Sequence, residues 1–101
     1  QGPKIRIEKF AGGKVSLVAG DEFSLLCRAD APPGDASQVG VSYLGLVNDV
    51  RPGDTLLLDD GLVAVEVLAI EGDRIRTRVL TDGALSDRKG LNRLGGHRKP
   101  R

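Results

Sequence analysis

Hydrophobic and polar residues alternate with a period of two along several short stretches of the chain. In residues 4–10, Ile5 and Ile7 fall on one face, and Lys4, Arg6 and Glu8 fall on the other. In residues 74–79, three arginines alternate with apolar or β-branched residues. Successive side chains of a strand point to opposite sides, so this alternation predicts two strands that each bury one face. The outward face of the second strand would carry Arg74, Arg76 and Arg78.

The longest apolar stretch, residues 55–70, contains two strand-like runs separated by Asp59, Asp60 and Gly61. An Asp-Gly pair between such runs favours a tight hairpin turn, because glycine adopts positive φ without steric cost and Asp tolerates it. We therefore expect a hairpin whose legs supply much of the core and whose tip exposes two adjacent carboxylates.

Turn residues separate the other strand candidates at intervals of about 8–12 residues, as in all-β proteins. We expect further strands at residues 14–18, 22–27 and 38–42, and one helical turn within residues 44–50. No stretch has a sustained helical period, so the sequence predicts an all-β protein, and we favour a small closed β-barrel of short antiparallel hairpins. Closure removes the exposed edges of an open sheet. Residues 86–101 show no apolar pattern, and there we expect no strand.

The composition agrees with one globular domain of modest size. The 101 residues are 40% hydrophobic and 29% charged, with a net charge of +1 that indicates no particular partner. Aromatic residues make up only 3%, so Val, Leu and Ile must fill the interior, which favours strands. Cys27 is the single cysteine, which excludes an internal disulfide. Because it is in phase with Phe23 and Leu25, we expect a buried thiol rather than a nucleophile or metal ligand.

Two features bear on location and completeness. No apolar run approaches the length of a membrane-spanning helix, and the first residues do not resemble a signal peptide, so we expect a cytoplasmic protein. The chain begins with the polar residue Gln1 rather than with Met, just before a predicted strand. We therefore expect it to be a piece of a larger protein.

Three motifs in order along the chain together resemble one protein family. They are Gly-Pro-Lys-Ile-Arg at residues 2–6, Leu-Leu-Asp-Asp-Gly at residues 57–61, and Ser-Asp-Arg-Lys-Gly-Leu-Asn at residues 86–92. Their order and spacing resemble the B domain of pyruvate kinase, a small β-barrel lid inserted into the catalytic (β/α) barrel of that enzyme. The resemblance covers residues 1–96, and within the family the sequence is similar to the bacterial members. Residues 97–101 remain as a basic tail that we expect to be disordered.

The resemblance implies a function for the parent enzyme. The domain would close over the nucleotide during phosphoryl transfer from phosphoenolpyruvate to ADP, the step of glycolysis that gives pyruvate and ATP. The implied cofactors are Mg²⁺ and K⁺, with their ligands outside this chain. The implied partners are ADP or ATP and the catalytic barrel of the same parent chain, in a homotetramer and without a membrane. The chain alone would carry no catalytic residue and be inactive.

The same resemblance assigns nucleotide contacts to Arg6, Lys89 and Asp60. The arginine at the position of Arg6 reaches the nucleotide phosphates when the lid closes, Lys89 makes the second phosphate contact, and Asp60 faces the nucleotide and its metal. A guanidinium suits this role because it gives two directed hydrogen bonds to phosphate oxygens. From the residues alone, Arg6 and Lys89 could equally be solvated surface charges, and Asp60 could be present only because the turn requires it.

The residues alone also leave two other functions open. A nucleic-acid-binding barrel could use the row of Arg74, Arg76 and Arg78 with the basic tail, although the chain is nearly neutral and has few aromatic residues for base stacking. A purely structural interaction module would not respond to nucleotide at all. The arginine row could instead pair with Glu66 or Glu71 on the preceding strand.

Overall fold

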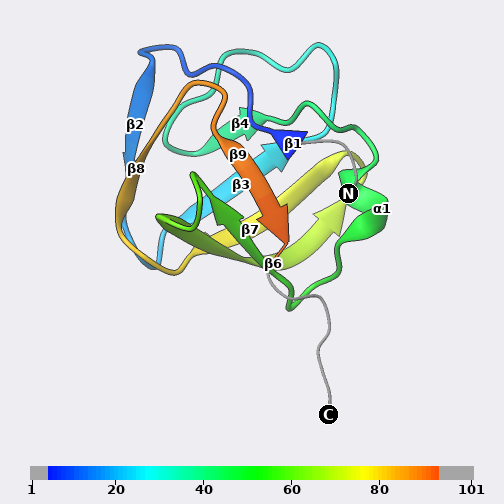
Figure 1. The fold of residues 1–101 in the computed structure, drawn as a ribbon. Helices are drawn as coiled ribbons and strands as arrows, with labels where there is room; N and C mark the ends of the chain where they lie inside the picture. The colour runs from blue at the N-terminus through cyan, green and yellow to red at the C-terminus, as the bar shows by residue number, and fades with distance from the viewer. Residues whose placement is uncertain (1–4, 94–101) are drawn as a thin grey trace.

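The computed structural model describes residues 5–93, which form nine strands and one short helix (Figure 1). The strands are β1 (Ile5–Arg6), β2 (Lys14–Leu17), β3 (Glu22–Leu26), β4 (Gln38–Gly40), β5 (Thr55–Leu58), β6 (Val63–Glu71), β7 (Arg74–Val79), β8 (Gly83–Ser86) and β9 (Gly90–Arg93), and helix α1 is Leu46–Asp49. The predicted domain boundary at residue 96 and the predicted disorder of residues 97–101 lie outside the described residues.

Seven strands form one curled sheet in the order β1-β9-β5-β6-β7-β3-β4, while β2 and β8 form a separate pair (Figure 1). The two edges of the large sheet meet at a seam, which we define as residues 6–8 and 40–42. At this seam Ile7 and Val41 form an antiparallel bridge, and the Glu8 N–H donates to the Gly40 carbonyl at 2.8 Å. The sheet therefore closes on itself, and the predicted all-β barrel is confirmed.

The seam also explains why β1 is shorter than the predicted strand at residues 4–10. The N–H of Ile7 still donates to the carbonyl of Lys89, at 2.9 Å on the β9 side, whereas the next N–H, that of Glu8, donates to Gly40 on the β4 side. The chain thus changes partner at this point instead of continuing along β9. A strand that serves both neighbours in turn completes the circle of hydrogen bonds.

The pairing of the strands differs from a simple succession of hairpins. Tight turns join β5 to β6 and β6 to β7, but β1 pairs with the much later β9, and β3 pairs with β4 in parallel. Alternation along a strand indicates which face is buried and does not identify the neighbouring strand. The barrel is therefore mostly antiparallel, with hairpins supplying only part of its pairings.

The expectation that no strand follows Ser86 is wrong, because β9 lies between β1 and β5. It pairs with β5 in an antiparallel register that extends from Leu56 opposite Arg93 to Leu58 opposite Leu91. Of its four residues only Leu91 is buried, at 2% exposure. A single apolar residue produces no alternation, which is why the hydrophobic pattern does not reveal this strand.

The hairpin at residues 55–70 forms as predicted. Strands β5 and β6 pair from Thr55 opposite Glu66 to Leu58 opposite Val63. Three residues of the turn, Asp59, Asp60 and Gly61, have φ values of 56°, 57° and 92°. The predicted helical turn within residues 44–50 is also confirmed, as α1. The local turn chemistry in the sequence therefore gave the right backbone at both places.

Strand β3 runs through the core of the barrel. Phe23, Leu25 and Cys27 are all buried, as the phase of the strand predicts. Ser24 and Leu26 on the opposite face are also buried, at 3% each, so this strand is covered on both sides. The other large side chains with almost no exposure are Ile7, Val39, Val41, Leu56, Leu58, Val63, Val65, Ile75, Leu85 and Leu91.

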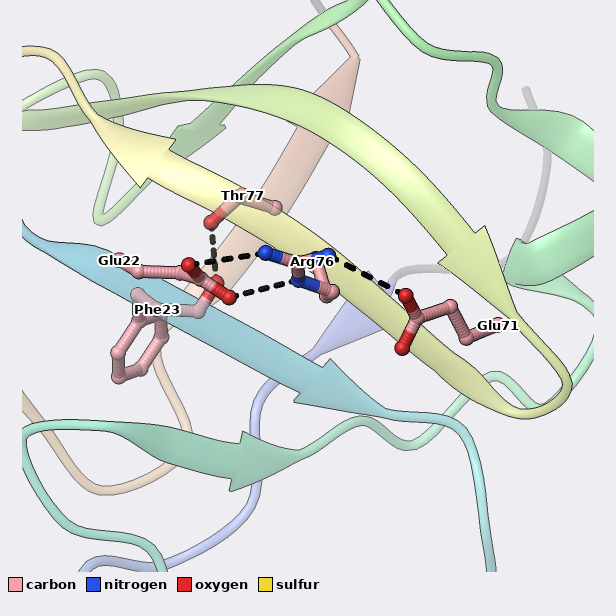
Figure 2. Close-up of polar contacts among 5 residues, drawn as sticks. All are labelled: Glu22, Phe23, Glu71, Arg76 and Thr77. Atoms are coloured by element: carbon pink, nitrogen blue, oxygen red, sulfur yellow. Dashed lines mark hydrogen bonds and ion pairs between the residues drawn. The ribbon is translucent and has the colours of Figure 1, made fainter.

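A charged network crosses the outer face of three neighbouring strands (Figure 2). Arg76 donates from Nε and Nη2 to the two carboxylate oxygens of Glu22, at 2.7 and 3.1 Å. It donates from Nη1 to Glu71 at 3.2 Å. These hydrogen bonds from Arg76 lower the pKa of the Glu22 carboxyl below its ordinary value. The sequence indicates Glu71 as a possible partner of the arginine row, but it gives no signal for Glu22, which reaches Arg76 diagonally from β3.

Thr77 lies on the inner face of β7, as its alternation predicts, and it is fully buried. Its hydroxyl donates to the carbonyl of Phe23 at 2.5 Å, across the β3-β7 pairing (Figure 2). A buried hydroxyl needs such a partner, because desolvation without a hydrogen bond is costly.

We expect Thr77→Val to lower the free energy of unfolding by about 1 kcal/mol, because valine has a similar shape but cannot donate this hydrogen bond. Urea unfolding of the 101-residue chain would measure the change. Thr55→Val is the matched control, since Thr55 lies half-buried on β5 and its hydroxyl donates to no backbone carbonyl within residues 5–93. Equal midpoints for wild type and Thr77→Val would show that the bond adds no stability.

A second prediction concerns Cys27, whose side chain lies in the core with its pKa raised by burial. The folded state holds the thiol proton more tightly than the unfolded state, so stability falls as pH rises above the ordinary thiol value of about 8.5. We expect this alkaline loss of stability to be smaller in Cys27→Ala than in wild type.

We also expect a thiol reagent to label Cys27 only upon denaturation. Rapid labelling of the native chain would contradict its placement in the core.

Candidate functional site

A polar pocket of about 380 Å³ opens between three segments that are far apart in the sequence. The segments are β1, the turn after β5, and the approach to β9. Arg6, Asp60 and Lys89 line this pocket together. The structure thus brings together the three residues to which the sequence motifs assign nucleotide contacts.

Arg6 lies on the seam, where its backbone is fixed from two sides. Its N–H donates to the Ser42 hydroxyl at 3.0 Å, and its carbonyl accepts from the Ser42 N–H at 2.8 Å. On the other side it faces Gly90 in the β1-β9 pairing. The side chain is exposed, and its Nη1 donates to the carbonyl of Arg88 at 3.2 Å. The guanidinium therefore extends into the pocket from a rigid base.

Lys89 approaches the hairpin turn from the segment just before β9. Its Nζ lies 4.0 Å from Oδ1 of Asp59, whose side chain is 22% exposed. The Asp59 N–H donates to the carbonyl of Gly90 at 2.9 Å, which ties the turn to the start of β9. An ion pair at this distance, with the lysine side chain 41% exposed, is weak. A ligand with stronger acceptor atoms can therefore compete for the ammonium group.

Asp60 is exposed at the tip of the hairpin in a left-handed conformation. Within residues 5–93 its carboxylate forms no ion pair. Asp59 instead accepts a hydrogen bond from the Leu62 N–H at 3.1 Å through its carbonyl, and so helps to close the turn. The two adjacent carboxylates thus differ in environment, and Asp60 is the one left open to solvent.

Two further residues of the pocket were not singled out from the sequence. Asp87 accepts a hydrogen bond from the Phe10 N–H at 2.7 Å, and Arg88 adopts a φ of 58°. Both belong to the motif at residues 86–92, but no hydrophobic or charge pattern in the sequence indicates what their backbone does. Together they hold the approach to β9 against the chain that follows β1.

The pocket contains charges of both signs. Arg6, Arg88 and Lys89 contribute three cations, and three carboxylates also line the wall. Guanidinium and ammonium groups bind phosphate oxygens and offset their charge. In the described part of the chain, no group of three or more His, Cys, Asp or Glu residues is arranged to hold a metal ion. The described residues therefore fit a phosphate ligand, and they do not by themselves form a metal centre.

The outward arginine row lies away from this pocket. Arg76 is engaged by Glu22 and Glu71, so the middle of the row is neutralised by carboxylates. A surface for nucleic acid needs cations that are free to meet phosphates. The pairing therefore disfavours the nucleic-acid-binding alternative.

No helix within residues 5–93 has the length and apolar character needed to cross a membrane.

Comparison with known proteins gives one consistent family. The family model described as pyruvate kinase, barrel domain, matches residues 1–99. Pyruvate kinase II of Salmonella typhimurium is 50% identical over 96 residues, and the pyruvate kinase of Haemophilus influenzae is 49% identical over 98 residues. Each match covers 95% of this chain and 20% of the relative. The chain therefore spans about a fifth of the length of these relatives.

Solved structures of the same family share the fold. A crystal structure of pyruvate kinase from Cryptosporidium parvum matches with a TM-score of 0.88 and 32% identity, over 93% of this chain and 19% of that one. A second structure of the Cryptosporidium parvum enzyme, in complex with ADP, matches with a TM-score of 0.86 and 31% identity, over 94% and 19%. The sequence motifs, the barrel and these matches agree, and the chain belongs to the pyruvate kinase family.

Proposed function

We propose that this chain is the lid domain of a pyruvate kinase, which closes over the nucleotide while the phosphoryl group of phosphoenolpyruvate passes to ADP. The observation that carries the proposal is the convergence of Arg6, Asp60 and Lys89 in one pocket. The related structure in complex with ADP supports a nucleotide as the ligand. The products of the parent enzyme would be pyruvate and ATP.

Arg6 and Lys89 would bind the nucleotide phosphates in the closed state. In phosphoryl transfer the protein contributes mainly by positioning the reactants and offsetting their charge. Arg6 suits this task because its backbone is fixed at the seam while, among residues 5–93, one of its five side-chain N–H donors is engaged. Lys89 would leave its weak contact with Asp59 for the phosphates.

Asp60 would face the nucleotide and its metal from the tip of the hairpin. Its open carboxylate gives an oxygen acceptor on the pocket wall, and oxygen atoms are the ligands that Mg²⁺ prefers. Magnesium, with potassium, would neutralise phosphate charge, and their ligands would lie in the catalytic barrel of the parent chain. Asp60 would therefore assist at the edge of the site without holding the metal alone.

The arrangement of the first and last described strands supports a hinged lid. Ile5 of β1 lies opposite Leu91 of β9, so the two ends of the barrel run side by side. Two adjacent connections allow a domain to swing as one body. Closure would exclude water from the transfer and bring the pocket to the phosphates. The proposed lid is residues 1–96, with residues 97–101 as a basic tail, in a cytoplasmic homotetrameric parent.

In the intact parent enzyme we expect Arg6→Ala to lower kcat on the order of 10²–10³-fold, as for other single electrostatic stabilisers. The KM for phosphoenolpyruvate should change little, because the catalytic barrel would hold that substrate. Steady-state kinetics with both substrates varied would measure this. Arg74→Ala is the control, since Arg74 is exposed on β7 outside the pocket. An unchanged kcat in Arg6→Ala would leave Arg6 as a surface charge.

We also expect the isolated chain to form no ATP from phosphoenolpyruvate and ADP, because it supplies only one wall of the site. Weak binding of ADP through exposed charges should disappear as salt is raised, since screening removes such contacts. A coupled ATP assay and calorimetric titration with ADP would test both points. Measurable turnover by the purified chain would contradict the proposal, and tight salt-sensitive binding of single-stranded RNA would favour the nucleic-acid alternative.

A further inference from the structure

Arg88 has an unusual backbone for its residue type. Its φ is 58°, in the left-handed region, and within residues 5–93 the other non-glycine residues with positive φ are Asp59 and Asp60. Asp tolerates this region because its short polar side chain can bond locally, but arginine gains no such help. A conformation that is disfavoured for the side chain persists only where the surrounding contacts impose it.

Within residues 5–93, the main-chain hydrogen bonds of Arg88 go to the chain at and after β1. The Arg88 N–H donates to the Glu8 carbonyl at 3.3 Å, and the Arg88 carbonyl accepts from Nη1 of Arg6 at 3.2 Å. The carbonyl of the next residue, Lys89, accepts from the Ile7 N–H at 2.9 Å. The φ and ψ of Arg88 relate the peptide plane that carries its N–H to the peptide plane that carries its carbonyl. With the N–H anchored on Glu8, the left-handed conformation therefore fixes the direction in which the Arg88 carbonyl points.

The carbonyl of Arg88 therefore orients a side chain 82 positions away in the sequence. The other fixed contacts of Arg6, to Ser42 and Gly90, all involve its backbone. Among the residues described, the Arg88 carbonyl is thus the hydrogen-bond acceptor that holds the guanidinium. This bond uses one of five N–H donors and leaves the others for a ligand.

We infer that Arg88 is a positioning residue, which acts through its left-handed main-chain carbonyl to set the direction of the Arg6 guanidinium before the nucleotide arrives. The inference rests on the proposed role of Arg6 at the nucleotide phosphates. A long side chain that is already oriented loses less conformational freedom on binding, and its charge is in place when the reaction begins. Arg88 itself need not touch the nucleotide for this purpose.

Arg88 is also among the residues that line the pocket, so a direct contact between its guanidinium and the nucleotide is the rival explanation. The two explanations differ in what a substitution must preserve. If the carbonyl acts, the backbone conformation matters and the guanidinium does not. If the side chain acts, every substitution that removes its charge has the same effect.

The test uses three variants of the intact parent enzyme: Arg88→Gly, Arg88→Asn and Arg88→Val. All three remove the guanidinium, but glycine and asparagine adopt positive φ readily whereas β-branched valine does not. We expect Arg88→Gly and Arg88→Asn to keep kcat within about twofold of wild type, and Arg88→Val to lower it about tenfold through misplacement of Arg6. The KM for phosphoenolpyruvate should stay constant. Arg74→Val makes the same side-chain change on an extended strand and serves as the control.

The same substitutions in an Arg6→Ala background separate positioning from general damage to the fold. With no guanidinium to orient, Arg88→Val should cause no further loss of kcat, so the two changes should be strongly non-additive. Additive losses would mean that Arg88 acts on the structure as a whole, and the inference would be wrong. Calorimetric titration with ADP should show the same pattern in affinity.

Each remaining outcome also decides the question. Equal losses in all three variants would assign the effect to the side chain, and wild-type activity in all three would show that Arg88 positions nothing. If Arg6→Ala itself leaves kcat unchanged, the proposed role of Arg6 fails first, and the inference fails with it. If Arg88→Val does not fold, Arg88→Ala makes the same comparison with a smaller left-handed penalty.

Discussion

The segment at residues 6–8 pairs with two different neighbours, and both the barrel and its pocket depend on this double pairing. Ile7 still bonds to the chain before β9, while Glu8 already bonds to β4. Without that change of partner the sheet would have two open edges, and the wall that carries Arg6 would be one of them. Closure therefore protects the edges and also gives a charged side chain a rigid point of attachment.

The pocket shows how a small barrel can build a polar site from strands and turns, since the one helix of its described part, α1, does not line it. Its walls come from β1, the hairpin turn and the approach to β9, which meet because β9 lies between β1 and β5. Main-chain hydrogen bonds hold each wall, such as that from Asp59 to Gly90 at 2.9 Å. Within residues 5–93 the charged side chains of the pocket make three structural contacts: Arg6 to the Arg88 carbonyl, Lys89 to Asp59, and Asp87 to the Phe10 N–H. Rigid backbone and lightly held charges suit a surface that receives its ligand on closing.

Features with a local signal could be predicted from the sequence, and features that depend on distant partners could not. The hairpin turn at Asp59–Gly61 and the inward face of β7 follow from neighbouring residues alone. Strand β9 contributes one buried residue, Leu91, and so leaves no alternation to detect. The diagonal pairing of Glu22 with Arg76 requires knowing that β3 lies beside β7. The positive φ of Arg88 has no signal in composition or spacing, because arginine rarely adopts it. The motifs assign nucleotide contacts to Arg6, Asp60 and Lys89, and it is the structure that shows all three lining one pocket.

The insertion of β9 between the first strand and the central hairpin has a consequence for biosynthesis. A ribosome releases the chain from its amino end, so β1 and β5 emerge while the strand that joins them is still being translated. The two can be bridged only after Arg93 has left the exit tunnel. Until then the nascent barrel has unpaired backbone along both strands, and pairings between such distant segments form slowly. Strand β1 is two residues long, so in a partly synthesised chain it exposes little edge with which another chain could pair.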